Sequence, residues 1–293
     1  MGKKGKKTQA GKPKKLTPKD IGKRLNVLAK KVEEELEGAD LFAPLPPTED
    51  CAICLVPMSC IKSETFYQAC CGKTICLACF IEHKESVNKQ NEEKSAGKKV
   101  AFTCPFCREP VPLTTDSMET VDAEYARLQA RCLRSDRNAL GMMGKHYREG
   151  EHIAKDHLKA LDCWIRAVEL GSAEACACIG DSYIQGDGLA ADKERVVLFQ
   201  RVGALRGAVL ARHNIGYSEY YNLGNHEIAI RHWKIAAEAG LQDSLNALRR
   251  IYNGNKAGKE FINKEYLEST YRACHEAQME VKTEEREKHS GAD

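Results

Sequence analysis

Hydrophobic and polar positions divide the chain into an amphipathic N-terminal segment, a cysteine-rich centre and a long C-terminal region with helical period. Residues 17–38 carry hydrophobic side chains at every third or fourth position, which places them on one side of a helix: Ile21, Leu25, Leu28, Val32 and Leu36. Thr17 suits the N-terminal cap, Pro18 the first helical position and Gly38 the end. This amphipathic helix is expected either to pack on the protein's own repeats or to pair with another helix.

The C-terminal region repeats itself. Three segments, MGKHYREG, IGDSYIQG and IGYSEYYNLG, align on Gly144, Gly180 and Gly216, which are spaced 36 residues apart. A second series of glycines ends the intervening helices: Gly171, Gly207 and Gly240. A weaker fourth unit, LRRIYNG, follows at 248–254 and is expected to act as a cap. Two helices in each unit of this length predict a solenoid of helical hairpins over residues 137–277, joined to the centre by a linker helix within 113–136.

Composition and charge limit the remaining possibilities. The 293 residues are 42% hydrophobic and 30% charged, and no run of eighteen apolar residues occurs, so no membrane segment is expected. The net charge of +3 is too small to imply nucleic acid as a partner. Residues 1–16 form a lysine-rich tail and 278–293 a charged tail, both expected to be disordered. The N-terminal tail lacks the apolar core of a secretory signal, which predicts an intracellular location, cytoplasm or nucleus.

Cysteines in the centre have metal-ligand spacing. Three Cys-x-x-Cys pairs occur: Cys51 with Cys54, Cys76 with Cys79, and Cys104 with Cys107. Each pair supplies two thiolates from one tight turn, which is half of a tetrahedral zinc site. Two complete sites need two more ligands, and Cys70 and Cys71 are the nearest donors. The expected cofactor is therefore two Zn2+ ions.

The other cysteines lack this spacing. Cys60 lies outside every pair and is expected to be a free thiol or a core residue. Five more fall within the helical repeats and are expected to be small buried residues: Cys132, Cys163, Cys176, Cys178 and Cys274.

The order of the pairs resembles the RING finger, and CGKTICLAC resembles its all-cysteine form, because Lys73 stands where the common form has a histidine. The resemblance covers residues 51–112 of a domain placed at 48–112. With Cys70 and Cys71 counted as the second of four pairs, it implies that the first and third pairs share one zinc: Cys51, Cys54, Cys76 and Cys79. It implies that the second and fourth share the other: Cys70, Cys71, Cys104 and Cys107. Cys70 is adjacent to Cys71 rather than one residue removed, which leaves His83 as the alternative eighth ligand.

The same resemblance implies a function. In RING-type ubiquitin ligases, positions that match Ile53, Pro105 and Arg108 contact the ubiquitin-conjugating enzyme, and the ligase acts by positioning, without a covalent catalytic residue. Leu55, Phe80 and Phe106 are expected to fill the small core. The alternative is a non-enzymatic zinc-binding scaffold for protein interactions.

The repeats resemble Sel-one-like repeats, relatives of the tetratricopeptide repeat, on their Tyr-x-x-Gly turns and small-residue helices. That resemblance implies a concave face that holds a substrate or adaptor protein. The expected fold is mainly α, with a small zinc-stapled α+β RING domain and a C-terminal α-solenoid of helical hairpins.

Overall fold

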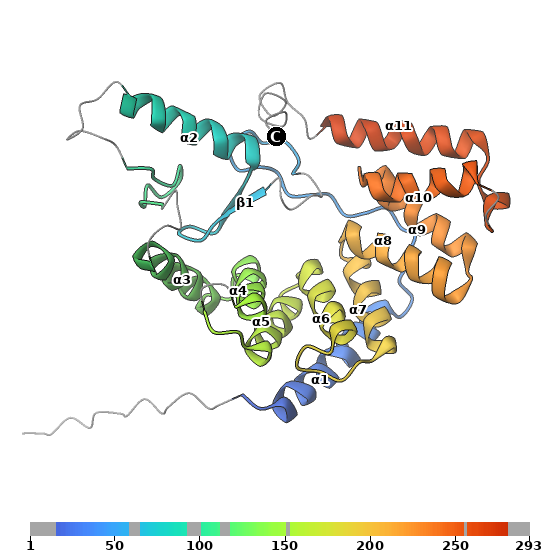
Figure 1. Cartoon of the computed structure of the whole chain (residues 1–293), viewed down its shortest axis with the longest axis horizontal. Coiled ribbons are helices and arrows are strands. Elements are labelled where there is room, and N and C mark those ends of the chain that lie inside the picture. Colours follow the sequence, from blue (N-terminus) through green and yellow to red (C-terminus); the bar gives the residue numbers. More distant parts are fainter. Residues whose placement is uncertain are drawn as a thin grey trace, which may run out of the picture.

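Helices dominate the structure, and one small sheet lies in the cysteine-rich centre (Figure 1), which confirms the predicted fold class. The computed structural model describes residues 16–58, 65–92, 101–111, 118–150, 153–254 and 257–280. Cys60 and most of both predicted tails lie outside these ranges. Among the described residues, no helix has the length and apolar character needed to cross a membrane.

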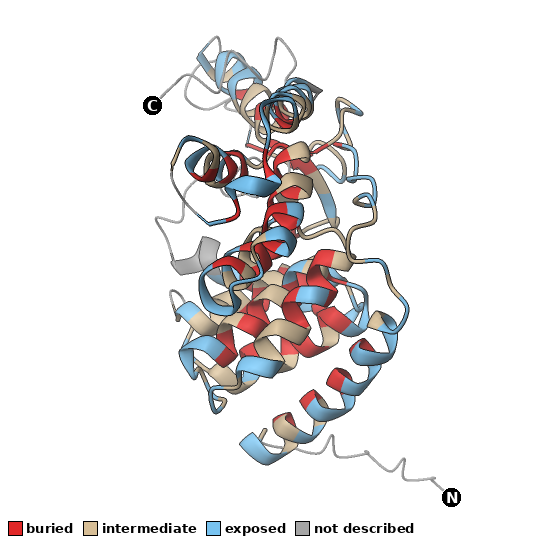
Figure 2. Cartoon of the chain, turned by 90° about the vertical axis from the view of Figure 1, so that its right-hand side faces the viewer, coloured by how far each residue is buried: buried red, intermediate tan, exposed pale blue. Residues whose placement is uncertain are grey.

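The amphipathic helix α1 spans Pro18–Leu36 and packs on the protein's own repeats. The Thr17 hydroxyl accepts a hydrogen bond from the Asp20 amide at 3.2 Å, and Gly38 takes a left-handed φ of 73°. One side of α1 is buried and the other exposed (Figure 2). The fifth residue of the predicted stripe, Leu36, is partly buried, and the other four are buried together with Ala29: Ile21, Leu25, Leu28, Ala29 and Val32. Of the two expectations for α1, the structure shows docking on the solenoid.

The cysteine-rich module contains strands β1 (Thr65–Gln68) and β2 (Lys73–Cys76), followed by helix α2 (Leu77–Glu92). The strands are antiparallel, with Phe66 opposite Ile75. Phe66 stacks on Phe80 at 4.1 Å between ring centroids, so Phe80 packs in the small core as expected. The expectation for Leu55 was wrong, because its side chain is 74% exposed. Its backbone has a left-handed φ of 58° directly after Cys54, and the side chain lies at the surface.

The C-terminal region folds as consecutive helical hairpins that stack on one another. A helix within the predicted linker, α3 (Met118–Leu133), packs on the first hairpin. The hairpins are α4/α5 (Arg137–Glu149, His157–Glu169), α6/α7 (Ala173–Gln185, Lys193–Leu205), α8/α9 (Val209–Ser218, His226–Glu238) and α10/α11 (Gln242–Asn253, Lys264–Glu280). A π-helical turn, η3 (Glu219–Leu223), extends α8, and a 3-10 turn, η4 (Lys259–Phe261), precedes α11.

The repeated glycines allow a tryptophan to pack against the helix backbone. The Trp164 indole N–H donates to the Gly141 carbonyl at 3.2 Å, and Gly144 lies against the same ring. Trp233 repeats this arrangement in the third hairpin, donating to the His213 carbonyl at 3.2 Å, with Gly216 under the ring. These close approaches explain the glycines at two of the three repeated positions, Gly144 and Gly216.

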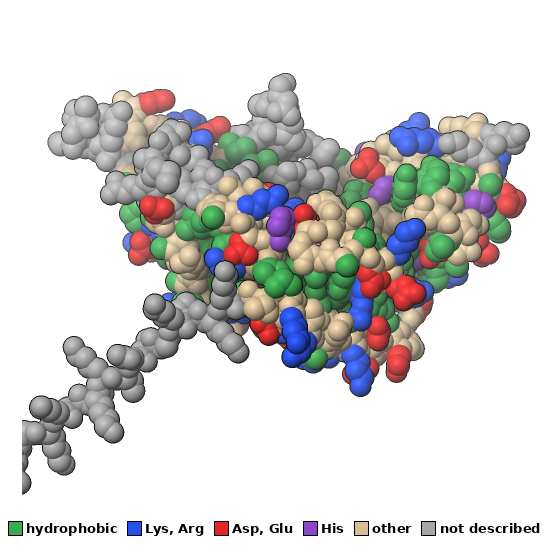
Figure 3. Space-filling model, turned by 60° about the horizontal axis from the view of Figure 1, so that its bottom comes forward, with side chains coloured by type: hydrophobic (Ala, Val, Ile, Leu, Met, Phe, Trp, Pro, Cys, Tyr) green, Lys and Arg blue, Asp and Glu red, His purple; other side chains and the backbone are tan. Residues whose placement is uncertain are grey.

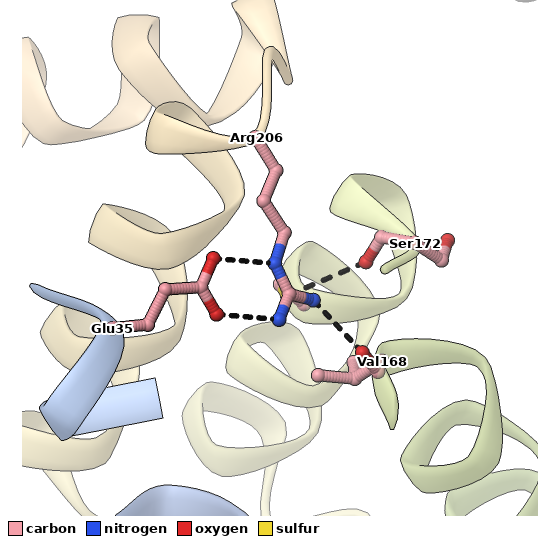
Figure 4. A network of polar contacts seen from close by, with 5 residues as sticks. Glu35, Val168, Ser172 and Arg206 are labelled. Carbon is pink, nitrogen blue, oxygen red and sulfur yellow. Dashed lines mark hydrogen bonds and ion pairs between the residues drawn. The ribbon is translucent and has the colours of Figure 1, made fainter. Parts of the chain in front are cut away.

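One guanidinium group, that of Arg206, joins the end of α1 to α5 and to the end of α7 (Figure 4). Arg206, after α7, donates to both carboxylate oxygens of Glu35 at 2.9 and 2.7 Å. The same group donates to the Val168 carbonyl, in α5, at 2.9 Å. This bidentate geometry fixes the orientation of both planar groups, and it fastens α1 to two neighbouring hairpins.

Candidate metal centre

Eight cysteine sulfurs gather into two groups of four. One group is Cys51, Cys54, Cys76 and Cys79, and the other is Cys70, Cys71, Cys104 and Cys107. Within each group all sulfurs lie within 4.8 Å of one another. The first and second Cys-x-x-Cys pairs therefore meet, while the adjacent Cys70 and Cys71 meet the third pair, so that the two sites interleave along the chain.

The donor set and its spacing fit a tetrahedral metal ion. Four ligands about 2.3 Å from zinc are about 3.8 Å from one another. The Cys54 and Cys76 sulfurs are 4.0 Å apart, and the Cys71 and Cys104 sulfurs are 3.6 Å apart. These eight side chains are positioned to hold two metal ions, each of which would compensate part of the charge of four thiolates.

Two of the Cys-x-x-Cys turns have the same backbone structure. The Leu55 amide donates to the Cys51 carbonyl at 2.9 Å, and the Arg108 amide donates to the Cys104 carbonyl at 3.0 Å. Leu55 and Arg108 both have a left-handed φ, 58° and 61°. A non-glycine residue in this region carries strain of about 1 kcal/mol, which the surrounding turn must offset. Each turn is closed by a short antiparallel bridge, Asp50 with Pro57 and Thr103 with Pro110.

In the first site, hydrogen bonds to the Cys51 sulfur favour the ionised form of that thiol. Burial alone would raise the pKa of Cys51, but the amides of Cys76 and Ile53 donate to its sulfur at 3.3 and 3.5 Å, and its pKa falls to about 7. Burial, followed by the neighbouring thiols, raises the pKa of Cys79 and of Cys70. Ionising all four thiols of a group therefore requires a cation among them.

The structure places Cys70, and not His83, in the second group of sulfurs. The His83 Nε2 atom lies 2.7 Å from the Thr103 carbonyl oxygen, and its ring packs on Phe102 with centroids 4.9 Å apart. The adjacent cysteines both reach the site because the chain turns tightly after β1. The Gly72 amide donates to the Gln68 carbonyl at 2.7 Å, and Gly72 has a φ of 78°.

Sequence reasoning did not find the contacts that join this second site to the solenoid. Arg131, at the end of α3, donates to the Cys70 carbonyl at 3.0 Å. Tyr67 donates to the Asp136 carboxylate at 2.6 Å, just before α4. The partners are 61 and 69 residues apart, and no local pattern in the sequence signals such pairs. The second site therefore lies directly against the first hairpin.

The three residues expected to contact a conjugating enzyme lie in the two turns. Ile53 lies between Cys51 and Cys54 and is 41% exposed. Pro105 is half-buried between Cys104 and Cys107, and Arg108 is exposed immediately after them. Each turn thus carries at least one of these side chains at the surface of a metal site.

Comparisons with known proteins give structural likeness only. No protein-family model matches the chain, and no curated protein matches it. A Sel1 repeat protein from Oxalobacter formigenes is similar to 54% of this chain, with 25% identity and a TM-score of 0.47. A protective antigen of uropathogenic Escherichia coli displaying an SLR fold is similar to 52%, with 22% identity and a TM-score of 0.44. The chain covers 65% and 32% of these two proteins, less than two thirds of each.

Proposed function

We propose that the protein is a RING-type ubiquitin-protein ligase that binds zinc, with a helical-repeat region of the Sel-one-like kind for a substrate or adaptor protein. The observation that supports this most is the interleaving of the two cysteine groups, with Ile53 and Arg108 exposed at the turns of opposite sites. Interleaved sites hold the two turns in one small rigid unit. A conjugating enzyme docked across both turns would meet an apolar side chain and a cation in fixed positions.

Zinc, when bound, would supply structural cross-links and no chemistry on the substrate. The protein's own residues would bind the conjugating enzyme and orient it with its ubiquitin. Ile53 would pack on the conjugating enzyme, Pro105 would extend that apolar contact, and the Arg108 guanidinium would donate hydrogen bonds to the enzyme and to its ubiquitin. Rate would come from holding the thioester and the attacking amine in a reactive orientation, which is an entropic contribution.

The solenoid is the proposed site for the substrate or adaptor. Its stacked hairpins resemble arrays that bind protein segments on an extended face. On the face shown in Figure 3, basic and acidic side chains of the described residues are interspersed, and neither sign gathers there. A nucleic-acid partner would need a basic patch, so we propose a protein partner. Thiols that bind zinc must stay reduced, so we propose a reducing compartment, cytoplasm or nucleus.

The test is ubiquitin transfer with purified components. The full-length protein is mixed with activating enzyme, ubiquitin and a panel of conjugating enzymes, and chain formation on the protein itself is measured. Ile53→Ala and Arg108→Ala should each reduce the rate at least tenfold while both metal ions stay bound. Leu133→Ala, an equally conservative truncation of a side chain that is 85% exposed, should leave the rate unchanged.

The alternative function is a non-enzymatic zinc-binding scaffold. No transfer with any conjugating enzyme of the panel, together with two bound metal ions, would reject the ligase and favour the scaffold. Equal loss of activity in the Leu133→Ala control would show that the assay reports folding and not enzyme contact.

A further inference from the structure

The segment that follows α1 lies on the solenoid as a strap, defined here as Asp40–Pro46. Figure 1 shows the chain after α1 passing from the α9 side of the solenoid to the β1 side. Arg212, in α8, donates to the Leu41 carbonyl and, at 3.3 Å, to the Ala43 carbonyl. The strap is thus held at two backbone positions that flank one residue, Phe42.

The Phe42 side chain packs on two residues of α9. The guanidinium carbon of Arg231 lies 3.6 Å from the centre of the Phe42 ring, and the His232 ring lies 4.9 Å from it. An arginine over an aromatic face is an attractive cation–π contact of about 0.5–2 kcal/mol. These two helix residues therefore recognise an aromatic side chain.

Pro46, the second of the two prolines in the strap, lies on a glycine. Gly207, in the turn before α8, has a φ of 99°, and a Cβ there would lie 2.7 Å from the Cγ atom of Pro46. Any larger residue would keep the strap away from the solenoid. Gly207, Arg212, Arg231 and His232 together form what we call the seat.

The seat and the strap differ in burial and in secondary structure. Arg212 is 1% exposed and His232 is 2% exposed, and both are fixed within helices. None of the strap residues is buried, and the strap has irregular backbone, with a local turn in which the Phe42 amide donates to the Asp40 carboxylate at 2.8 Å. Arg212 and His232 therefore lie in buried positions of the solenoid, whereas the strap is a surface segment placed upon them.

A buried guanidinium requires acceptors. The Arg212 Nε atom has no hydrogen-bond partner among the described residues, so the two strap carbonyls provide the acceptors that this group has there. Burial lowers the pKa of Arg212, and the Asp40 carboxylate opposes that shift. With the seat empty, the Arg212 guanidinium would lose these two carbonyl acceptors, and water would have to replace them. The seat is consequently specific for a segment that presents backbone carbonyls.

We infer that the seat is a peptide-binding site that the strap occupies within its own chain, and that it also takes an extended segment of a partner protein with the same chemistry. Such a segment has an aromatic residue flanked by two free carbonyls, an acidic residue two positions before it and a proline four positions after it. Because every recognition element is a surface feature of the strap, a partner segment can replace it without unfolding a helix. The inference does not depend on ligase activity.

Binding of the strap sequence as a separate peptide tests this. A fluorescein-labelled peptide of residues 39–50 is titrated with the full-length protein, and binding is followed by fluorescence anisotropy. Phe42→Ala in the protein weakens the strap as an intramolecular competitor, so this variant should bind the peptide at least tenfold more tightly than the wild type does. The peptide with Phe42→Ala should bind neither protein.

Seat variants in the Phe42→Ala background identify the site. Arg231→Gln, at an exposed position that leaves the core intact, should weaken binding at least threefold, and Arg212→Met at least tenfold. Arg201→Gln, which removes a nearby exposed arginine outside the seat, should have no effect. No peptide binding to the Phe42→Ala protein, or equal binding by the Arg231→Gln and Arg201→Gln variants, would overturn the inference. A concentration-dependent wild-type dimer that Phe42→Ala dissociates would also overturn it, since the occupant would then be a second copy's strap.

Discussion

The Tyr67 phenol donates a hydrogen bond to the Asp136 carboxylate at 2.6 Å. Through this bond the cysteine-rich module contacts the start of α4, the first helix of the solenoid. The same carboxylate caps α4, accepting from the amides of Asn138 and Ala139 at 3.0 and 3.1 Å. Burial, followed by the carboxylate, raises the pKa of Tyr67 well above its ordinary value, so the phenol stays protonated and remains a donor. One carboxylate therefore serves both a helix end and the contact between modules.

Removing the phenol should weaken this contact. Tyr67→Phe leaves the ring in place and removes one hydrogen bond to a charged acceptor, which is worth about 1.5–3 kcal/mol. We expect the free energy of unfolding, measured by urea denaturation, to fall by that amount. Tyr271→Phe removes a hydroxyl from a side chain that is 53% exposed and should change it by less than about 0.5 kcal/mol. If the two variants have equal stability, the contact contributes nothing.

Metal content should distinguish Cys70 from His83 as a ligand. The wild type should bind two zinc ions per chain, and Cys70→Ala should lose the ion of the second site because only three sulfurs remain there. His83→Ala should keep both ions, since its ring contacts Thr103 and Phe102. Elemental analysis of the purified variants measures this. Retention of two ions by Cys70→Ala together with loss of one by His83→Ala would reverse the assignment.

The repeated glycines should differ in how much they tolerate a methyl group. A Cβ at Gly216 would lie 2.7 Å from the Trp233 Nε1 atom, and one at Gly144 would overlap the Trp164 ring. Gly144→Ala and Gly216→Ala should each destabilise the protein by about 2–3 kcal/mol through overpacking.

Gly180 is the matched control for those two substitutions. Gln200 lies near Gly180 in place of a tryptophan ring, and the nearest atoms to a Cβ there are 3.8 and 3.9 Å away. Gly180→Ala should therefore be neutral or stabilising, by up to about 1 kcal/mol, because alanine favours the helix. Thermal denaturation of the three variants compares them directly, and an equal loss at all three positions would contradict the packing argument.

His232 should make stability fall in mild acid. Burial first, and then Arg212, Arg201 and Arg231, lower its pKa from 6.5 to about 4. Between these values the unfolded chain binds a proton that the folded chain does not, so stability decreases as the pH falls from about 6.5 towards about 4. The whole loss is about 3 kcal/mol, and about 2 kcal/mol of it is reached by about pH 5.

Comparison of two pH values isolates this histidine. The free energy of unfolding of the wild type minus that of His232→Gln should be about 2 kcal/mol smaller at about pH 5 than at about pH 7.5, because glutamine cannot be protonated there. Taking the difference at each pH cancels the thiols and carboxylates that the two proteins share. A constant difference for His232→Gln would mean that His232 is not held neutral.

The sequence by itself determined the features that arise from short-range spacing. The stripe of α1, its cap at Thr17 and the repeating hairpins follow from periods of a few residues or of one structural unit. Pairs of cysteines with two residues between them likewise indicated metal ligands, because one tight turn suffices to bring two sulfurs together. The resemblance to a RING finger added which pairs meet.

Only the tertiary structure decided the features that depend on how distant segments meet. Leu55 lies at the surface because of its left-handed backbone, although its apolar side chain suggested burial. Glu35 pairs with Arg206 across 171 residues, and the buried Arg212 guanidinium donates to the Leu41 carbonyl across the same separation. A charged residue in a sequence is compatible with solvent, with an ion pair or with a buried site. The choice among these depends on desolvation and on the acceptors that chain folding brings within reach.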